Sequence, residues 1–321
     1  MAIQATPMAT TAKTTLQPGS AVIAVQAAPD QRSRLRHLSS AYPIKLISPL
    51  SPPSSSSSRA VLAFLLSYGG GLVAGDRLAL SVTVDPSARL GLLTQGSTKL
   101  YRGLPPSRTA TVATVRDAAA LLLLPDPLQP FCGSAHEQRQ TLRLHHRASA
   151  LLLDWVSEGR PGCDGVVWAP AELRSVTEVW RLPEDEGAPP RLLVRDNLIL
   201  RGGSVRECVA GLGVVGTVIV GGPLFDGLAR FFRDEFAGLP RVGEVDWARD
   251  DDDDNDSDSA RRRGGGPEVL WSAAAVRGFT VVKFGAGSVD GARRWLRGML
   301  EREGTVAREF GTRFLMCLQD R

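Results

Sequence analysis

The feature that most constrains this chain is a series of short apolar segments with period-two alternation. In the segment LALSVTV, Leu78, Leu80, Val82 and Val84 fall on one face, as expected for a half-buried strand. Turn residues separate such segments every eight to twelve positions. The further segments are Arg89–Leu93, Thr109–Val115, Ala118–Leu124, Gln140–Leu144, Ala150–Val156, Glu172–Arg181, Leu192–Leu200 and Thr217–Val220. This spacing predicts a mainly β fold, either a sandwich or a helical, solenoid-like stack of strands, and excludes βαβ units.

A few helices are predicted, all in the C-terminal third. Phe225–Leu239 and Ser288–Glu303 place apolar side chains at helical spacing. Ser288 is a suitable N-cap, and Asp290 in the first turn suits the helix dipole. We interpret both aromatic stripes as core contacts, with a partner-docking face as the alternative.

Composition bounds the class of protein. The chain has 321 residues, 43% hydrophobic and 22% charged, which suffices for a folded core. We expect a disordered N-terminal tail over residues 1–30 and a single domain over 31–321. No apolar run reaches the roughly 20 residues that span a bilayer, and residues 1–19 lack a secretory signal. The four Cys form no CxxC pair, so we expect buried free thiols in a reducing compartment, and therefore a cytoplasmic protein.

Two low-complexity insertions interrupt the predicted domain, at residues 51–58 and 246–267. The second begins with a block of Asp, and we interpret it as a solvated loop and not as a metal or nucleic-acid site. Residues 246–263 hold eight Asp and four Arg, a net charge of −4 within a chain of +4, so the rest of the chain carries +8. A basic body without interleaved aromatic residues predicts acidic protein partners and no nucleic acid.

Motifs for enzyme chemistry are missing from the sequence. Gly69–Asp76 reads GGGLVAGD, but neither GxxxxGK[ST] nor GxGxxG occurs, which argues against a nucleotide loop. The chain contains no GxSxG nucleophile motif, and its four His stand near no recognisable Ser or Cys signature. We therefore predict no catalytic residues and no tightly bound cofactor.

Several carboxylates stand beside Gly or Pro or near the ends of predicted strands. They are Asp76, Asp126, Asp154, Glu158 and Asp164. An Asp in a turn commonly caps its own backbone. The alternative is that such oxygens hold a divalent metal weakly, and both interpretations stay open at this point.

The order of the motifs resembles the urease accessory protein D family (UreD, also called UreH), in its eukaryotic, fungal branch. The resemblance covers residues 32–212. The matching pieces are SAYPIKLISP from Ser40, GGGLVAGDR from Gly69, LTQGSTKLYR from Leu93, LPDP from Leu124, and ALLLDW from Ala150 followed by EGR from Glu158. The resemblance marks as structural or binding residues Gly70, Gly71, Gly75, Thr94, Gly96, Thr98, Lys99, Tyr101 and Arg102.

The resemblance implies a non-enzymatic scaffold, or metallochaperone, in the cytoplasm. Such a protein binds apo-urease together with the UreF-like protein, which recruits the UreG-like GTPase. Nickel then passes to the urease active site, through an internal tunnel. The alternative is an interaction scaffold of the same fold without a urease role.

A nickel conduit must bind its cargo weakly enough to release it. Four His and four scattered Cys do not build a tight nitrogen and sulfur site, so transient Ni²⁺ is expected on oxygen ligands. We predict Asp76, Asp126, Glu158 and Asp164 as these weak ligands. Cys132 departs from the family pattern, either as a stray buried thiol or as an added soft ligand.

Overall fold

The computed structural model describes residues 16–49, 59–160, 166–185, 187–202, 205–209, 211–239 and 269–319. Within them, strands form two sheets. The first sheet contains, in spatial order, β15 (Arg191–Arg201), β14 (Glu172–Arg181), β12 (Ala135–Leu144), β9 (Ser107–Val115), β6 (Arg77–Val84), β1 (Ser20–Ala27) and β2 (Ser33–Ser40). The second contains β17 (Val269–Val276), β18 (Phe279–Ala286), β16 (Val214–Gly221), β13 (Ser149–Ser157), β10 (Ala120–Leu124), β7 (Arg89–Thr94), β4 (Val61–Ser67) and β3 (Ile44–Ile47), with β5 (Gly71–Leu72), β8 (Thr98–Leu100) and β11 (Leu128–Pro130) at its side.

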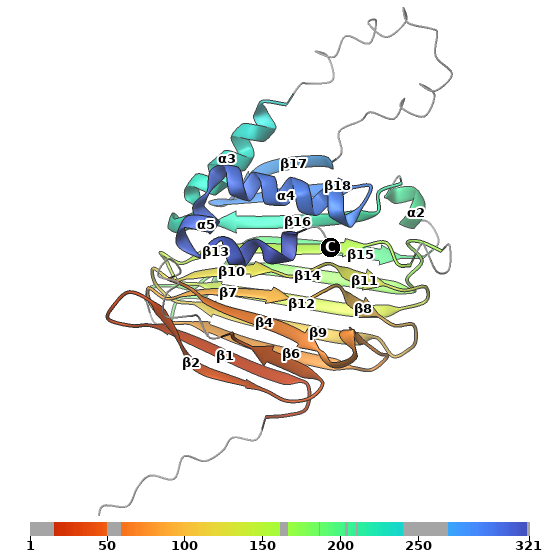
Figure 1. Ribbon diagram of the computed structural model, residues 1–321, viewed down its shortest axis with the longest axis horizontal. Helices are drawn as coiled ribbons and strands as arrows, with labels where there is room; N and C mark the ends of the chain where they lie inside the picture. The colour runs from red at the N-terminus through yellow and green to blue at the C-terminus, as the bar shows by residue number, and fades with distance from the viewer. Residues whose placement is uncertain are drawn as a thin grey trace, which may run out of the picture.

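The chain winds as a solenoid through the middle of the molecule. Successive strands alternate between the sheets, and each pairs in parallel with the strand one coil earlier: β6, β9, β12 and β14 in the first sheet, and β4, β7, β10 and β13 in the second. Figure 1 shows these coils as a stack running from β1 and β2 to the helices. Because the pairs are in register, inward residues of one coil lie over those of the next.

An apolar core fills part of the space between the sheets. It includes Leu80, Val82 and Val84 of β6 and Leu90 and Leu92 of β7. The alternation predicted for this segment is confirmed, since the side chains of Leu80, Val82 and Val84 are buried while Arg77 and Ala79 are exposed.

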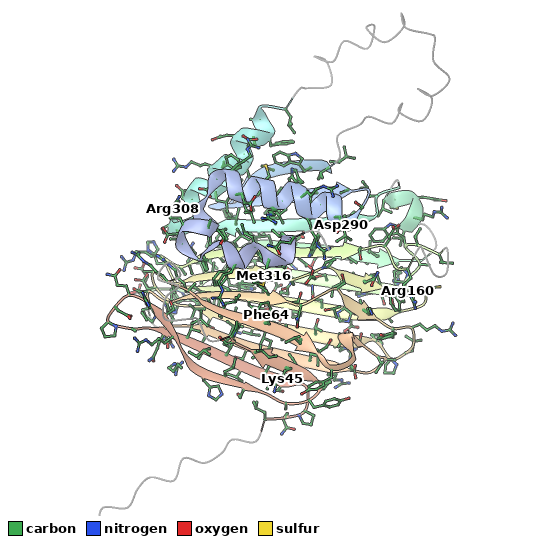
Figure 2. The ribbon with its side chains drawn as sticks, in the orientation of Figure 1. Lys45, Phe64, Arg160, Asp290, Arg308 and Met316 are labelled. Atoms are coloured by element: carbon green, nitrogen blue, oxygen red, sulfur yellow. The ribbon has the colours of Figure 1, made fainter. Side chains whose placement is uncertain are left out.

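The outer face of the second sheet carries the helices α3 (Asp226–Ala237), α4 (Val289–Glu303), α5 (Thr305–Glu309) and the 3₁₀-helix Thr312–Leu318. Their apolar faces form a second core with Trp155 and Phe284. Figure 2 labels Met316 of the 3₁₀-helix near Phe64 of β4, and both pack against this core. The aromatic stripes are therefore core contacts, as predicted, and Ser288 caps α4 by accepting a hydrogen bond from the backbone N–H of Gly291 at 3.1 Å.

Some expectations require correction. The predicted tail of residues 1–30 extends too far, because β1 pairs with both β2 and β6 and buries Ile23 and Val25.

Cys132, expected to be buried, is exposed, as is Cys208, while Cys317 is buried. The insertions predicted at 51–58 and 246–267 lie outside the described residues. Among the described residues, no helix is both long and apolar enough to cross a bilayer.

Gly91 offers a test of the packing of the 3₁₀-helix. A Cβ built there would lie 2.2 Å from the ring of Phe314, so Gly91→Ala should lower the free energy of unfolding by about 1–3 kcal/mol. Gly298→Ala is the matched control, since nothing lies within 4 Å of its added Cβ on α4. It should stabilise the protein by about 0.5–1 kcal/mol through helix propensity. Urea unfolding measures the stability of both variants. Equal stability of Gly91→Ala and wild type would contradict the close contact between Gly91 and Phe314.

Candidate functional site

A cavity of 110 Å³ lies between the two sheets and borders the apolar core at Leu80 and Leu123. Its lining includes apolar side chains such as Leu72 and Leu78. It also includes the polar side chains of Thr94, Thr98, Thr109, Thr111, Asp126, Gln138, Gln140 and Asp154. These polar groups make the space unlike an empty apolar void, because water or a small hydrated ion would find hydrogen-bond partners there.

Strand register produces the polar side of the cavity. Within the first sheet, Thr111 of β9 lies beside Gln140 of β12, Gln140 beside Thr177 of β14, and Thr177 beside Asp196 of β15. The amide of Gln140 donates to the Thr177 hydroxyl at 3.2 Å. A row of polar side chains therefore crosses four strands, parallel to the axis of the solenoid. We call it the polar row.

Asp154 of β13 faces the polar row from the second sheet. Its carboxylate accepts hydrogen bonds from Ser175 Oγ at 2.7 Å, Thr177 Oγ1 at 3.2 Å and Gln138 Nε2 at 3.0 Å. The side chain is half-buried, and it lines the cavity. Desolvation by burial raises the pKa of Asp154, the hydroxyl donors oppose that shift, and the nearby Asp196 reinforces it.

Asp196 connects the polar row to the surface. Its carboxylate accepts a hydrogen bond from Thr217 Oγ1 at 2.9 Å and forms an ion pair with Lys283, which also donates to Thr217 at 2.8 Å. The Lys283 side chain is 51% exposed, whereas that of Asp196 is 16% exposed. A continuous set of oxygen atoms therefore runs from the cavity through Asp154 to solvent at Lys283.

A surface hollow of 120 Å³ adjoins the cavity on another side. The lining residues common to both are Leu65, Leu66, Ser67, Thr94 and Thr98. Gly70 and the Gln95–Ser97 turn complete the rim of the hollow. The cavity therefore shares part of its wall with this surface hollow, and polar side chains connect it to the surface at Lys283.

The two sequence motifs singled out above meet at this hollow. β5, which contains Gly71, pairs in parallel with β8, which contains Thr98 and Lys99. A Cβ on Gly71 would lie 2.5 Å from the Lys99 carbonyl oxygen, so only glycine allows this approach. Tyr101 packs edge-on against Phe131 at 5.4 Å, and Arg102 forms a β-bridge with Ser134. Gly70, Gly75 and Gly96 lie in the flanking turns.

The predicted metal ligands have separate positions. Asp126 lines the cavity, but its carboxylate is committed to Arg293 of α4, with an ion pair of 2.8 Å, and to the Thr94 hydroxyl at 3.0 Å. Asp76 accepts a hydrogen bond from the Val73 backbone N–H at 2.9 Å, which is the turn cap of the alternative interpretation.

Glu158 follows β13 and is partly buried, and desolvation raises its pKa. Asp164 lies outside the described residues. Among the described residues, no three His, Cys, Asp or Glu side chains gather as a group that could hold a metal ion. The carboxylates do not form one tight site, and their role as weak ligands stays a prediction.

His136 has the structural role expected for a buried histidine. Its ring nitrogens lie 2.9 Å from Ser107 Oγ and 3.2 Å from Thr109 Oγ1. Burial lowers the pKa of His136 to about 4, so the ring is neutral at physiological pH.

Comparison with known proteins identifies the family. The model of the family described as UreD urease accessory protein matches residues 17–313. The chain belongs to the UreD family. It is 33% identical over 300 residues to urease accessory protein 4 of Cryptococcus neoformans, covering 83% of this chain and 85% of that protein. It is 30% identical over 270 residues to an uncharacterized urease accessory protein ureD-like of Schizosaccharomyces pombe, covering 79% and 84%. A UreD of Sorangium cellulosum is 34% identical over 181 residues, covering 56% and 54%.

Within this UreD-family structure, the residues missed as site candidates are Gln138, Gln140, Thr177 and Asp196. Asp154 is among the carboxylates named from the sequence but not among the four predicted metal ligands. Their common signal is a polar residue at an inward position of an alternating strand. Such a residue costs free energy unless its hydrogen bonds are satisfied, so its presence in several adjacent coils marks a built site.

The raised pKa of Asp154 makes a pH-dependent prediction. Because the folded state holds its proton more tightly than the unfolded state, wild-type stability falls as pH rises from about 4, the ordinary pKa of Asp, up to the raised folded pKa. Asp154→Asn removes this loss. The difference in unfolding free energy between Asp154→Asn and wild type should therefore shift in favour of the variant between pH 4 and pH 7.

Urea unfolding at a series of pH values measures this difference. Asp234→Asn on α3, at an exposed acid, is the control and should show no such drift. A difference that stays constant with pH for Asp154→Asn would disprove the pKa shift.

Proposed function

We propose that this UreD-family protein is a cytoplasmic urease maturation scaffold. It binds apo-urease together with UreF-like and UreG-like accessory proteins, and it passes nickel to the urease active site. Membership of a urease accessory family over residues 17–313 is the observation that carries the proposal. A scaffold role without catalysis agrees with a family whose members are named accessory proteins.

The proposed nickel route follows the polar row. It connects Lys283 and Asp196, through Asp154, to the cavity and the hollow beside Gly70. Hydroxyl, amide and carboxylate oxygens are weaker ligands for nickel than imidazole or thiolate, so an ion on this route exchanges readily. Nickel is cargo here, bound transiently, and Asp154 provides a carboxylate on the cavity wall that no described cation neutralises.

The ion pair between Asp126 and Arg293 supports a division of roles among the carboxylates. With its Oδ1 atom on Arg293 and its Oδ2 atom on Thr94, Asp126 is largely neutralised and attaches α4 to the cavity wall. Asp154 has hydroxyl and amide donors but no cationic partner among the described residues. We therefore assign the principal nickel contact to Asp154 and a structural role to Asp126.

Co-purification tests the partners. The tagged protein, expressed in its urease-positive host, should recover urease and the UreF-like protein. Recovery of neither would favour the alternative, an interaction scaffold of the same fold without a urease role. Deletion of the gene should abolish urease activity, and added nickel should restore it in part.

Asp154→Asn tests the route. In a reconstituted activation mixture, this variant should lower the nickel content of urease several-fold, because the route loses the Asp154 carboxylate while its shape is kept. Nickel per urease, measured by elemental analysis, is the readout, and the complex should assemble as in wild type. Asp234→Asn is the matched control. Full nickel loading with Asp154→Asn would exclude the route through the polar row.

A further inference from the structure

One end of the solenoid exposes a continuous set of aromatic and apolar side chains. The rings of Tyr42 and Tyr68 lie 5.3 Å apart. Gly71, three residues after Tyr68, lies so close to Tyr101 that an added Cβ would be 2.7 Å from the Tyr101 ring. Tyr101 in turn packs on Phe131. The loop of Leu104 joins the same end, because the backbone N–H of Gly75 donates to the Pro105 carbonyl at 2.9 Å.

These side chains are unusually exposed for their type. Leu104 is 75% exposed, Tyr42 71%, Val73 54% and Tyr68 53%. Single exposed apolar residues need no explanation, but a contiguous group at one end of a fold commonly marks a protein-binding surface. We call the surface formed by Tyr42, Tyr68, Val73, Leu104, Lys99 and Arg102 the aromatic end.

The charges at the aromatic end are positive. Lys99 and Arg102 are exposed, and neither forms an ion pair with a described residue. Arg160 lies over the Phe131 ring, 5.0 Å from its centroid, and Figure 2 shows it at this end of the strands. Asp76, the nearby acid, is turned to its own backbone. Lys99 and Arg102 therefore have no carboxylate partner among the described residues.

The aromatic end borders the surface hollow beside the cavity. The hollow is lined by Gly70 and by Thr98, the residues adjacent to Gly71 and Lys99. The unpaired cations Lys99 and Arg102 beside this hollow disfavour the approach of a divalent metal ion from solvent. An acidic partner seated there would neutralise these cations and continue the oxygen-lined route across the interface.

We infer that the aromatic end is the docking surface for an acidic face of a partner protein, one that carries apolar side chains at its centre, and that docking opens the route to nickel. Charge complementarity sets the register and the rate of such an association, while burial of the tyrosines and Leu104 supplies affinity. This inference rests on the proposed function for its nickel cargo, but the surface chemistry is independent of it.

The double variant Lys99→Glu/Arg102→Glu tests the surface. The first probe is a random copolymer of glutamate and tyrosine, which has the predicted partner chemistry. We expect wild type to bind it, and the variant to bind it about tenfold more weakly or worse, with a flatter dependence on salt concentration. The control is Arg143→Glu/Arg191→Glu, an equal charge change at exposed arginines of the first sheet that form no ion pair with described residues. Equal binding by the two double variants would overturn the inference.

Purified apo-urease and the UreF-like protein are the second and third probes. Loss of either complex in Lys99→Glu/Arg102→Glu, with both retained in the control, supports the inference and identifies the partner. Retention of both complexes overturns it. Failure of wild type to bind either protein refutes the proposed function instead, and the copolymer measurement still decides the surface. Leu104→Ser, which keeps every charge, should weaken the same complex, and urea unfolding checks that each variant is folded.

Discussion

The in-register parallel stacking of coils is the constraint on which the rest of this structure depends. It places each inward side chain over its counterpart in the next coil, so that like residues form continuous rows along the solenoid axis. Val82 and its counterparts Ala113, Leu142 and Val179 build part of the apolar core, while Thr111, Gln140, Thr177 and Asp196 build the polar row. A slip of one residue in a single strand would turn its side chains to the opposite face and interrupt both rows.

The helices complete the fold from outside. They cover the outer face of the second sheet, where Trp155 and Phe284 pack against them. The buried pair of Arg293 and Asp126 joins α4 to the wall of the cavity at 2.8 Å. Breaking such a pair leaves an uncompensated buried charge, so the position of α4 and the lining of the cavity depend on each other. The cavity wall and α4 are therefore joined as one structural unit.

Much of the fold was predictable because strands and helices depend on patterns among residues that are close in the sequence. Glu172–Arg181 was predicted with the bounds observed, and the helix predicted over Ser288–Glu303 is observed over Val289–Glu303, directly after its Ser288 cap. The site was predictable only in part. Asp126 lines the cavity, but its partner Arg293 is 167 residues away in the sequence, and no local pattern joins the two. Asp154 and Asp196 lie on different sheets, so their proximity follows from the winding of the chain.

The sequence by itself determined the mainly β class, the placement of the long helices and, through its ordered motifs, the UreD family. These properties depend on side-chain periodicity and on residues that are near one another along the chain. Only the tertiary structure decided which carboxylates face the cavity, which are turn caps and which are neutralised by arginine. Those roles depend on register between coils and on burial, because the free energy of a charged group is set by the partners and the solvent around it.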